Sequence, residues 1–489
     1  MHTRRAALLC LAILLALPTG DALAQSRGVP TRGGQDGGTG SRGGDHNGHH
    51  GGYPGGYFGG WGGIGGVIMT LPQAPPPERV IDEDDAPVVR RSHRAQRPQR
   101  PPQRTARRAS GAPPSGERRF VPDEVVLELH NTVSERQIQT LQRRFRLTQI
   151  ERQRLQLSGT TFFRWRIPDR RSVPTVVRAL EADRLVVSAQ PNYTYSLQQA
   201  KAAAEGDPAQ YELAKLHLPE AHALSKGDGV RVAVIDSGVD ADHPDINGSV
   251  AESFNAIQTP AAPHAHGTAI AALIAAHGRL MGAAPDARIL AVRAFDPKGG
   301  SAQGTTFAIL KGIDWAAGHG ARIINMSFAG PADPAMQRSL EAAYKKGIVL
   351  IAAAGNAGPK SPPLYPAADP EVIAVTATDA QDRLLPVANR GRHIAVAAPG
   401  VDLLVAIPNG GYEISSGTSY SAAEVSGIAA LLLQHKGTLA PEQLRRVLLE
   451  TAKDLGRTGR DDLFGAGLAD SYAALAAGAE TSQAARKRR

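Results

Sequence analysis

Between residues 120 and 200 the chain alternates short strand-like runs with segments of helical period. Runs in which every second residue is apolar are typical of half-buried strands, and apolar residues that recur every three or four positions are typical of amphipathic helices. The expected elements are, in order, a strand at 125–129, a helix at 134–145, strands at 147–157 and 160–168, a helix at 172–183 and a strand at 184–196. This β-α-β-β-α-β order predicts a small ferredoxin-like α+β unit over residues 120–200.

The region from residue 201 to residue 480 contains longer, continuous apolar runs. The run VRVAVID, which ends at Asp236, is of the kind that is buried on both faces of a parallel sheet. Two segments rich in small and apolar residues predict helices, one from His266 and one from Ser419 to a stop at Gly437. Because ligands bind beyond the carboxyl ends of strands in open α/β sheets, we expect Asp236 to face a crevice.

The first 119 residues lack the pattern of a folded core. Residues 1–24 combine a basic start, an apolar stretch and the sequence Ala22-Leu23-Ala24, which predicts a secretory signal peptide and a secreted or periplasmic protein. Cys10 is the only cysteine and lies inside this signal, so we expect neither disulfides nor thiol chemistry in the mature protein. Residues 25–119 are rich first in glycine and then in proline and arginine, a composition that predicts disorder. No later apolar run reaches the roughly 18 residues that span a bilayer.

The formal net charge of +9 is unevenly distributed. Residues 88–119 hold ten arginines and one glutamate, and the tail at 481–489 ends in RKRR. An arginine-rich segment can bind an anionic surface through salt-sensitive contacts; a solvated linker is the alternative, because no nucleic-acid-binding fold accompanies it. Residues 120–200 carry +4 and residues 201–485 carry −6, so we expect the basic unit to dock on the acidic one.

Three motifs carry the candidate chemistry: DSGVDADHPD from Asp236, HGTAIA from His266 and SGTSYSAAEVSG around Ser419. Serine is a poor nucleophile unless a base lies within hydrogen-bond reach and a third group orients that base. A serine at a helix start also has free backbone N–H groups beside it, which stabilise an oxyanion. Each motif alone fits an ordinary turn or helix start, but such readings leave their co-occurrence unexplained. We therefore predict nucleophilic hydrolysis of a peptide bond.

With these motifs, residues 208–478 resemble the subtilisin-like serine proteases, and a weaker likeness extends back to Phe120. The resemblance implies a doubly wound, mostly parallel α/β catalytic domain. It implies that Asp236 orients the imidazole, that His266 is the general base and acid, and that Ser419 is the nucleophile. The segment IVLIAAAGNAG matches the family strand that ends in an asparagine, so Asn356 is the expected oxyanion-hole donor; an Asn-Ala-Gly turn is the alternative.

The same resemblance implies that a substrate binds as an added strand between two exposed edges. The matching edges are Ser327-Phe328-Ala329 and Gly300-Ser301-Ala302. Ala329 stands where the family usually has glycine, and Leu364 stands where a small residue often forms the floor of the main specificity pocket. Both would narrow that pocket and favour small substrate residues such as alanine, unless Leu364 turns away into the core.

Other departures from the family concern the active-site helix and a calcium loop. Ala423 replaces a usual proline and Glu424 replaces a frequent histidine, and neither residue is expected to take part in the chemistry. The segment HGRLMGAAPDARIL is about three residues shorter than the family form that carries a calcium loop. Calcium needs six to eight oxygen ligands, so we expect no strong site there, while a weaker structural site elsewhere stays open. We expect no required cofactor and assign no metal ligand.

The ferredoxin-like unit resembles the propeptide that assists folding and blocks the active site in this family; a free-standing binding module is the alternative. The overall expectation is a secreted serine endopeptidase that acts on proteins and peptides through an acyl-enzyme and is made as a self-processed precursor inhibited by its own propeptide. The small residues of QQAKAAAEG place the expected cut between Gln198 and Gly206. A cell-surface binding protein, with the protease fold as a scaffold and the arginine-rich arm as the binding element, is the alternative function.

Overall fold

The computed structural model describes residues 110–198, 210–260, 262–298, 301–437 and 439–477. All of them belong to one unit of the chain, Arg100–Arg489. The predicted signal peptide, the glycine-rich segment, most of the arginine-rich segment and the basic tail lie outside the described residues. Within the described ranges, no helix combines the length and the apolar character that a bilayer-spanning segment requires.

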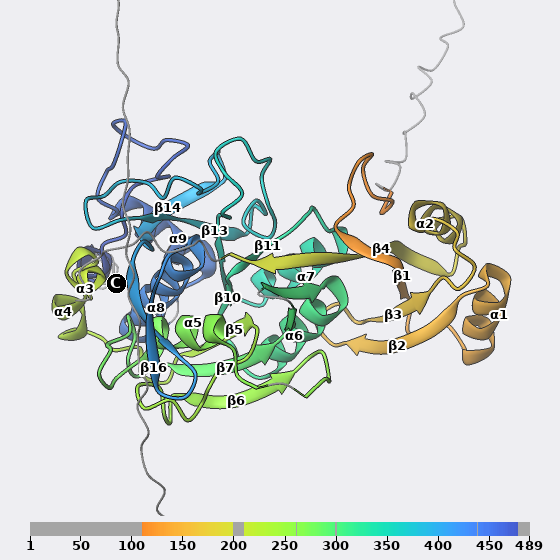
Figure 1. Cartoon of the computed structure of the whole chain (residues 1–489), viewed down its shortest axis with the longest axis horizontal. Helices are drawn as coiled ribbons and strands as arrows, with labels where there is room; N and C mark the ends of the chain where they lie inside the picture. Colours follow the sequence, from red (N-terminus) through yellow and green to blue (C-terminus); the bar gives the residue numbers. More distant parts are fainter. Residues whose placement is uncertain (1–109, 199–209, 261, 299–300, 438, 478–489) are drawn as a thin grey trace, which may run out of the picture. The chain divides into compact units, whose positions relative to one another are not determined.

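Residues 110–198 form an N-terminal module with the predicted β-α-β-β-α-β order (Figure 1). Its elements are β1 (Phe120–Leu129), α1 (Glu135–Phe145), β2 (Thr148–Leu155), β3 (Thr160–Arg166), α2 (Val173–Glu181) and β4 (Val186–Leu197). Helix α1 begins at a capping box, in which the Ser134 side chain accepts from the backbone of Gln137 and the Gln137 side chain binds the Ser134 backbone.

The antiparallel sheet of this module has the order β2-β3-β1-β4, and its two faces bury different residues. On one face, Val125 and Leu127 pack with α1 and α2. On the other face, Val126 packs with Phe307 and Leu310 of the C-terminal module. The alternation along β1 follows from the pleat of a strand, which points successive side chains to opposite faces. The module therefore buries both faces of its sheet, one under its own helices and one against its neighbour.

Residues 210–477 form a C-terminal module around a seven-stranded parallel sheet of order β14-β13-β12-β10-β5-β7-β6. Its strands are β5 (Arg231–Asp236), β6 (Val250–Asn255), β7 (Arg288–Arg293), β10 (Ile323–Met326), β12 (Val349–Ala353), β13 (Val372–Thr378) and β14 (Ile394–Pro399). Its helices are α3 (Tyr211–Lys215), α4 (Leu218–His222), α5 (Ala265–Ala275), α6 (Thr306–Gly318), α7 (Pro334–Lys345), α8 (Thr418–Lys436) and α9 (Pro441–Glu450). The remaining strands are β8 (Phe295–Lys298), β9 (Ser301–Thr305), β11 (Phe328–Ala329), β15 (Leu403–Ile407) and β16 (Gly411–Ser415).

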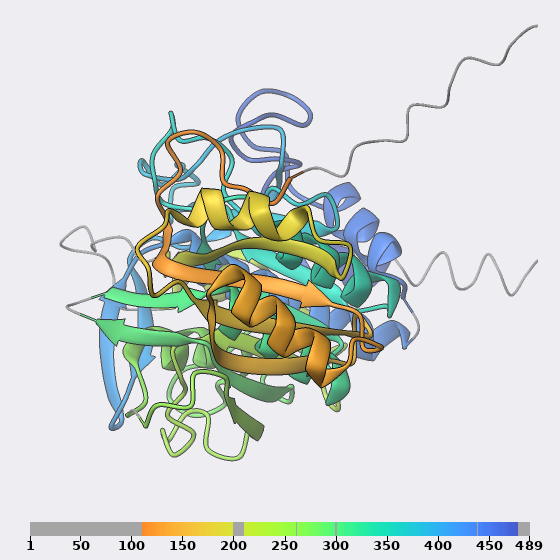
Figure 2. The same cartoon turned by 90° about the vertical axis from the view of Figure 1, so that its right-hand side faces the viewer.

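Helices cover both faces of the parallel sheet, which confirms the predicted doubly wound fold. Val232 and Val234 of β5 share a core with α5 and α8. Ala233 and Ile235 of the same strand share a core with α6 and α7. Figures 1 and 2 show these helices around the sheet. Residues 232–235 of the run VRVAVID are all apolar, because helices cover both faces of the sheet.

Strand β4 belongs to both modules. The first part of β4, residues 186–193, pairs with β1. Its last part, residues 194–197, pairs with β9 and β11 of the C-terminal module. Figure 1 shows its arrow running toward β11. The last strand of the N-terminal module thereby becomes the strand between two edges of the C-terminal module.

Two ion pairs between the modules join acidic side chains of the N-terminal module to basic side chains of the C-terminal module. Glu151 Oε1 lies 2.6 Å from Lys311 Nζ, and Glu128 Oε2 lies 2.7 Å from Arg338 Nη2. This polarity is opposite to the one that we expected from the net charges. Net charge is a sum over a whole segment, whereas the charge complementarity of an interface depends on the residues in contact. In these two ion pairs the N-terminal module contributes glutamates and not its arginines.

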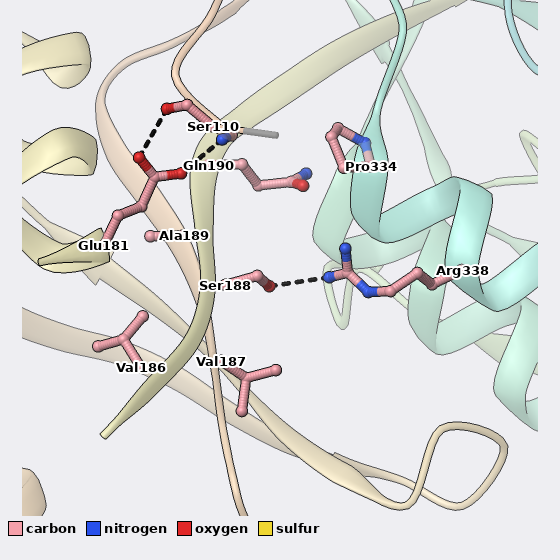
Figure 3. A pocket seen from close by; sticks show the side chains of 10 residues that line it. Ser110, Glu181, Val186, Val187, Ser188, Ala189, Gln190, Pro334 and Arg338 are labelled. Carbon is pink, nitrogen blue, oxygen red and sulfur yellow. Dashed lines mark hydrogen bonds between the residues drawn. The ribbon is translucent and has the colours of Figure 1, made fainter. Parts of the chain in front are cut away.

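Residues 110–119, which we predicted as the end of a disordered linker, have defined partners. Ser110 Oγ donates to Glu181 at the end of α2, at 2.6 Å. Nearby, a cavity of about 450 Å³ separates β4 from α7, where the Arg338 guanidinium donates to Ser188 Oγ (Figure 3). The composition of this segment did not reveal these contacts, because they depend on a carboxylate about seventy positions along the chain.

Candidate active site

Asp236 and His266 form a buried pair at the carboxyl end of the parallel sheet. Asp236 is the last residue of β5, and His266 is the second residue of α5. His266 Nδ1 lies 2.9 Å from each carboxylate oxygen of Asp236, and both side chains have zero exposure. A Cβ atom on the next residue, Gly267, would lie 2.3 Å from the Gly238 carbonyl oxygen, so only glycine allows the helix start to approach the strand end this closely.

Ser419 lies at the start of α8, as the sequence predicts, and its hydroxyl faces two carbonyl oxygens. Ser419 Oγ lies 2.6 Å from the carbonyl oxygen of Gln198 and 2.9 Å from that of Ser327. His266 Nε2 is buried and has no hydrogen-bond partner among the described residues. The structure therefore brings together Asp236 and His266 by a hydrogen bond, but the hydroxyl of Ser419 is directed to carbonyl groups instead of to the imidazole.

Asn356 follows β12, and Thr418 fixes the orientation of its amide. The backbone N–H and the hydroxyl of Thr418 both donate to Asn356 Oδ1, at 3.2 and 2.9 Å. Asn356 Nδ2 is buried and has no partner within the described part of the chain. An amide that is fixed by its oxygen and has free N–H groups is suited to donate to an oxyanion.

The end of the N-terminal module occupies the place where a substrate strand was expected. Leu197 pairs with Phe328, Ser196 pairs with Ala329, and the Gln198 N–H donates to the Ser327 carbonyl oxygen at 3.3 Å. The first predicted edge, Ser327-Phe328-Ala329, is therefore a strand edge that binds an extended segment. The Gln198 side chain accepts from the Asn356 N–H at 2.8 Å.

The second predicted edge was misplaced along the sequence. The residues of β9 that pair with β4 are Gln303, Gly304 and Thr305. Ser301 instead pairs with Lys298 inside the β8–β9 hairpin, and Gly300 lies outside the described residues. The edge that pairs with β4 thus lies at residues 303–305, three positions beyond the predicted 300–302.

Ala329 and Leu364 lie on adjacent segments next to Asn356. Gly330 and Tyr365 pair through two backbone hydrogen bonds, which brings these segments together. Leu364 is buried, and its Cδ1 lies 3.0 Å from the position of a Cβ on Gly355, the residue before Asn356. Leu364 is thus directed to the segment that follows β12, and its role in the specificity pocket stays a prediction.

Two residues beside the Asp–His pair were not predicted. Ser237 donates to Asp236 Oδ1 from its backbone N–H at 2.7 Å and from its hydroxyl at 2.9 Å. His264 precedes α5, and its Nδ1 accepts from the His266 N–H at 3.3 Å. Both adjoin a motif that we identified, and a search for polar neighbours of those motifs would have found them.

The segment that lacks a calcium loop binds a carboxylate through its backbone. The N–H groups of Arg279 and Leu280 donate to the buried side chain of Asp245, at 2.6 and 3.2 Å. Both oxygens of the Asp245 carboxylate therefore accept hydrogen bonds from the backbone of this segment. The described residues contain no group of three or more His, Cys, Asp or Glu side chains arranged to hold a metal ion.

The comparisons with known proteins agree with this geometry. Residues 227–467 match the Subtilase family. The chain is 36% identical over 314 residues to the thermophilic serine proteinase of Bacillus sp. (strain AK1), an alignment that covers 62% of this chain and 76% of that protein. It is 35% identical over 258 residues to thermitase of Thermoactinomyces vulgaris, with 51% of this chain and 90% of thermitase covered.

Among solved structures, fervidolysin from Fervidobacterium pennivorans, described as a keratinolytic enzyme related to subtilisin, superimposes with a TM-score of 0.63 and 25% sequence identity. The match covers 75% of this chain and 62% of fervidolysin, so this chain spans less than two thirds of that protein. The identities and coverage, together with the fold and the buried Asp–His pair, establish that the chain belongs to the subtilase family and is a subtilisin-like serine protease.

Proposed function

We propose that this protease hydrolyses internal peptide bonds with Ser419 as nucleophile, His266 as general base and acid, and Asp236 as the group that orients the imidazole. The observation that carries the proposal is the 2.6 Å distance between Ser419 Oγ and the Gln198 carbonyl oxygen, beside the buried Asp236–His266 pair. The unpartnered Nε2 of His266 leaves the imidazole free to take a proton.

The reaction follows from these positions. Ser419 Oγ forms a bond to the substrate carbonyl carbon while its proton passes to His266 Nε2. The carbonyl oxygen becomes negative and accepts from Asn356 Nδ2 and from the Ser419 backbone N–H. His266 then gives its proton to the leaving amine, and water hydrolyses the acyl-enzyme by the same route. The proposed chemistry requires no cofactor.

The first substrate that we propose is the chain itself, cut after Gln198. The expected range for the cut was Gln198 to Gly206, and Gln198 is the residue whose carbonyl group lies at Ser419. The hydrogen bonds of Leu197, Ser196 and Gln198 to the neighbouring edges support binding as a substrate strand. A narrowed pocket favours a cut after one of the alanines that follow Gln199. Because the Gln198 carbonyl lies at Ser419, we instead propose a cut at the first bond of the expected range.

We further propose that residues 110–198 inhibit the enzyme after this cut and until they are degraded. The carboxylate of Asp333 supports this role, because it joins the modules at the start of α7. It accepts from Gln190 Nε2 at 2.6 Å and from the Tyr195 hydroxyl at 2.9 Å, both in β4. A buried carboxylate with these donors holds β4 in place while the end of the strand covers Ser419.

Export from the cytoplasm, and binding of the arginine-rich segment to an anionic surface, remain proposals from the sequence. Mass spectrometry of the amino terminus of exported protein tests the first. Salt-dependent binding to anionic vesicles, with and without residues 88–109, tests the second.

One experiment tests the catalytic proposal and the processing site together. The full chain and its Ser419→Ala variant are expressed, incubated with a fluorophosphonate probe and analysed by mass spectrometry. We expect labelling at Ser419 and a new amino terminus at residue 199 in the wild type only. Cleavage of both chains at the same bond would show that another protease processes this one, and an unlabelled Ser419 in processed protein would contradict the assigned nucleophile.

A further inference from the structure

The hydroxyl of Ser237 lies between the carboxylate of Asp236 and a second imidazole. Ser237 Oγ is 2.9 Å from Asp236 Oδ1 and 2.9 Å from His264 Nδ1. Ser237 and Asp236 are fully buried, and His264 is partly buried. Four side chains thus form one path: His264, Ser237, Asp236 and His266.

Two hydrogen-bond arrangements are possible along this path, because the Ser237 hydroxyl has a single hydrogen and can donate either to His264 or to Asp236. When His264 Nδ1 has no proton, it accepts from the Ser237 hydroxyl and from the His266 N–H, and Asp236 loses the hydroxyl hydrogen bond. When His264 Nδ1 carries a proton, it donates to Ser237 Oγ, and the hydroxyl donates to Asp236 Oδ1. An additional donor makes the carboxylate a weaker partner for the imidazole of His266.

We propose that His264 is a positioning residue whose protonation, relayed through Ser237, controls how strongly Asp236 holds the imidazole of His266. The proposal rests on the proposed roles of Asp236 and His266. It adds a second imidazole to the site, one that is linked to His266 through Ser237 and Asp236.

The charges around His264 define the direction of the effect. Burial lowers the pKa of His264, the Asp236 carboxylate from β5 raises it, and the His266 imidazole from α5 lowers it. On the neighbouring strand β7, Arg293 pairs in register with Asp236, and its guanidinium binds Asp296. Burial, the largest of these effects, favours the neutral form of the His264 imidazole.

Two imidazoles beside one carboxylate repel each other when both are charged. A charge on the His264 imidazole therefore opposes a second charge on the His266 imidazole. Removing the charge of His264 should shift the acid limb of the activity profile to higher pH.

The ordinary alternative is that His264 only caps α5 through the His266 N–H. The variant His264→Asn separates the two roles, because asparagine is a strong helix cap that carries no charge. A capping role predicts an unchanged pH profile in this variant. His222→Asn is the matched control, since His222 is also partly buried with a lowered pKa but bonds the Ala283 carbonyl oxygen instead of the site.

The experiment measures kcat/KM on a peptide substrate, and the rate of fluorophosphonate labelling, from pH 5 to pH 9 after the full chain has processed itself. For each variant, kcat/KM at pH 6 is divided by kcat/KM at the high-pH plateau. In His264→Asn we expect this ratio to be roughly threefold lower than in the wild type, an effect typical of a screened charge pair. His222→Asn should superimpose on the wild type. Ser237→Ala should lower kcat, and in that background His264→Asn should shift the acid limb less than it does in the wild type.

Nitrogen NMR of the histidine rings in the Ser419→Ala full chain gives a second readout that needs no activity. We expect the pKa of His266 to rise in His264→Asn and to stay unchanged in His222→Asn. Coincident acid limbs and an unchanged His266 titration in His264→Asn would overturn the inference. If Ser419 fails to label in the wild type, the proposed function fails, while the NMR titration still decides whether His264 and His266 are coupled.

Discussion

Ser419 Oγ lies 2.6 Å from the carbonyl oxygen of Gln198, a residue more than two hundred positions earlier in the chain. The contact joins the start of α8 to the end of β4, and β4 is held there by strands of both modules. The site is therefore covered by the chain's own backbone, and the first three of the four predictions below use this relationship or the side chains around it.

Asn356→Ala should reduce kcat by roughly 10²–10³ and change KM little, because the Asn356 amide donates to charge that develops only in the transition state. Steady-state kinetics on a peptide substrate measures both constants. Thr418→Val should give a smaller loss of kcat, since it removes only the hydroxyl that orients Asn356 Oδ1. A loss confined to KM in Asn356→Ala would instead indicate a substrate contact.

Leu364→Gly should widen the range of residues accepted before the scissile bond. Leu364 is buried beside Gly355, so removing its side chain opens space next to the strand that bears Asn356. A peptide library should show cleavage after small residues in the wild type and added cleavage after Phe and Tyr in the variant. A wild-type preference for aromatic residues would contradict the narrowed pocket.

Tyr195→Phe should weaken inhibition by the N-terminal module roughly tenfold, because it deletes one hydrogen bond to the buried Asp333 carboxylate and no apolar contact. The delay between processing and the appearance of activity measures this effect in the full chain. Tyr472→Phe is the control, since Tyr472 is exposed. An equal delay in Tyr195→Phe and the wild type would show that the Tyr195 hydroxyl does not hold the module.

Glu424→Gln should stabilise the protein above neutral pH. Burial raises the pKa of Glu424 and raises the pKa of Glu212 to about 7, and the charge of Glu212 raises the pKa of Glu424 further. A carboxyl with a raised pKa in the folded state contributes its full stability below the ordinary glutamate pKa and loses it as pH rises through the folded value.

The Tm of Glu424→Gln should therefore exceed that of the wild type by about 2–4 °C at pH 8, as roughly 1 kcal/mol produces in a domain of this size. The difference should disappear near pH 4. Glu442→Gln, at an exposed side chain, is the control. Equal Tm values at pH 8 would show that the buried carboxyls carry no such cost.

The sequence predicted the parts of this structure that local patterns encode. The continuous apolar run before Asp236 indicated a strand covered on both faces, and the run VVLEL indicated a strand that became part of β1. The positions of His266 and Ser419 at helix starts follow from the same patterns.

Local sequence patterns did not predict the contacts between segments that lie far apart in the chain. The sequence placed the second substrate edge at residues 300–302, whereas the residues that pair with β4 are 303–305. The polarity of the Lys311–Glu151 contact could not be read from net charge, because a sum over a segment does not say which side chains meet.

Because β4 pairs with both modules, cleavage of the chain after Gln198 and release of the N-terminal module are two separate events. Breaking the bond after Gln198 removes one covalent link and none of the backbone pairs between β4 and its neighbours. A nicked but silent species should therefore accumulate, with a lifetime determined by unbinding and degradation of the cut segment instead of by the cut. Under the proposed export and processing, molecules would travel from their source before they begin to digest their surroundings.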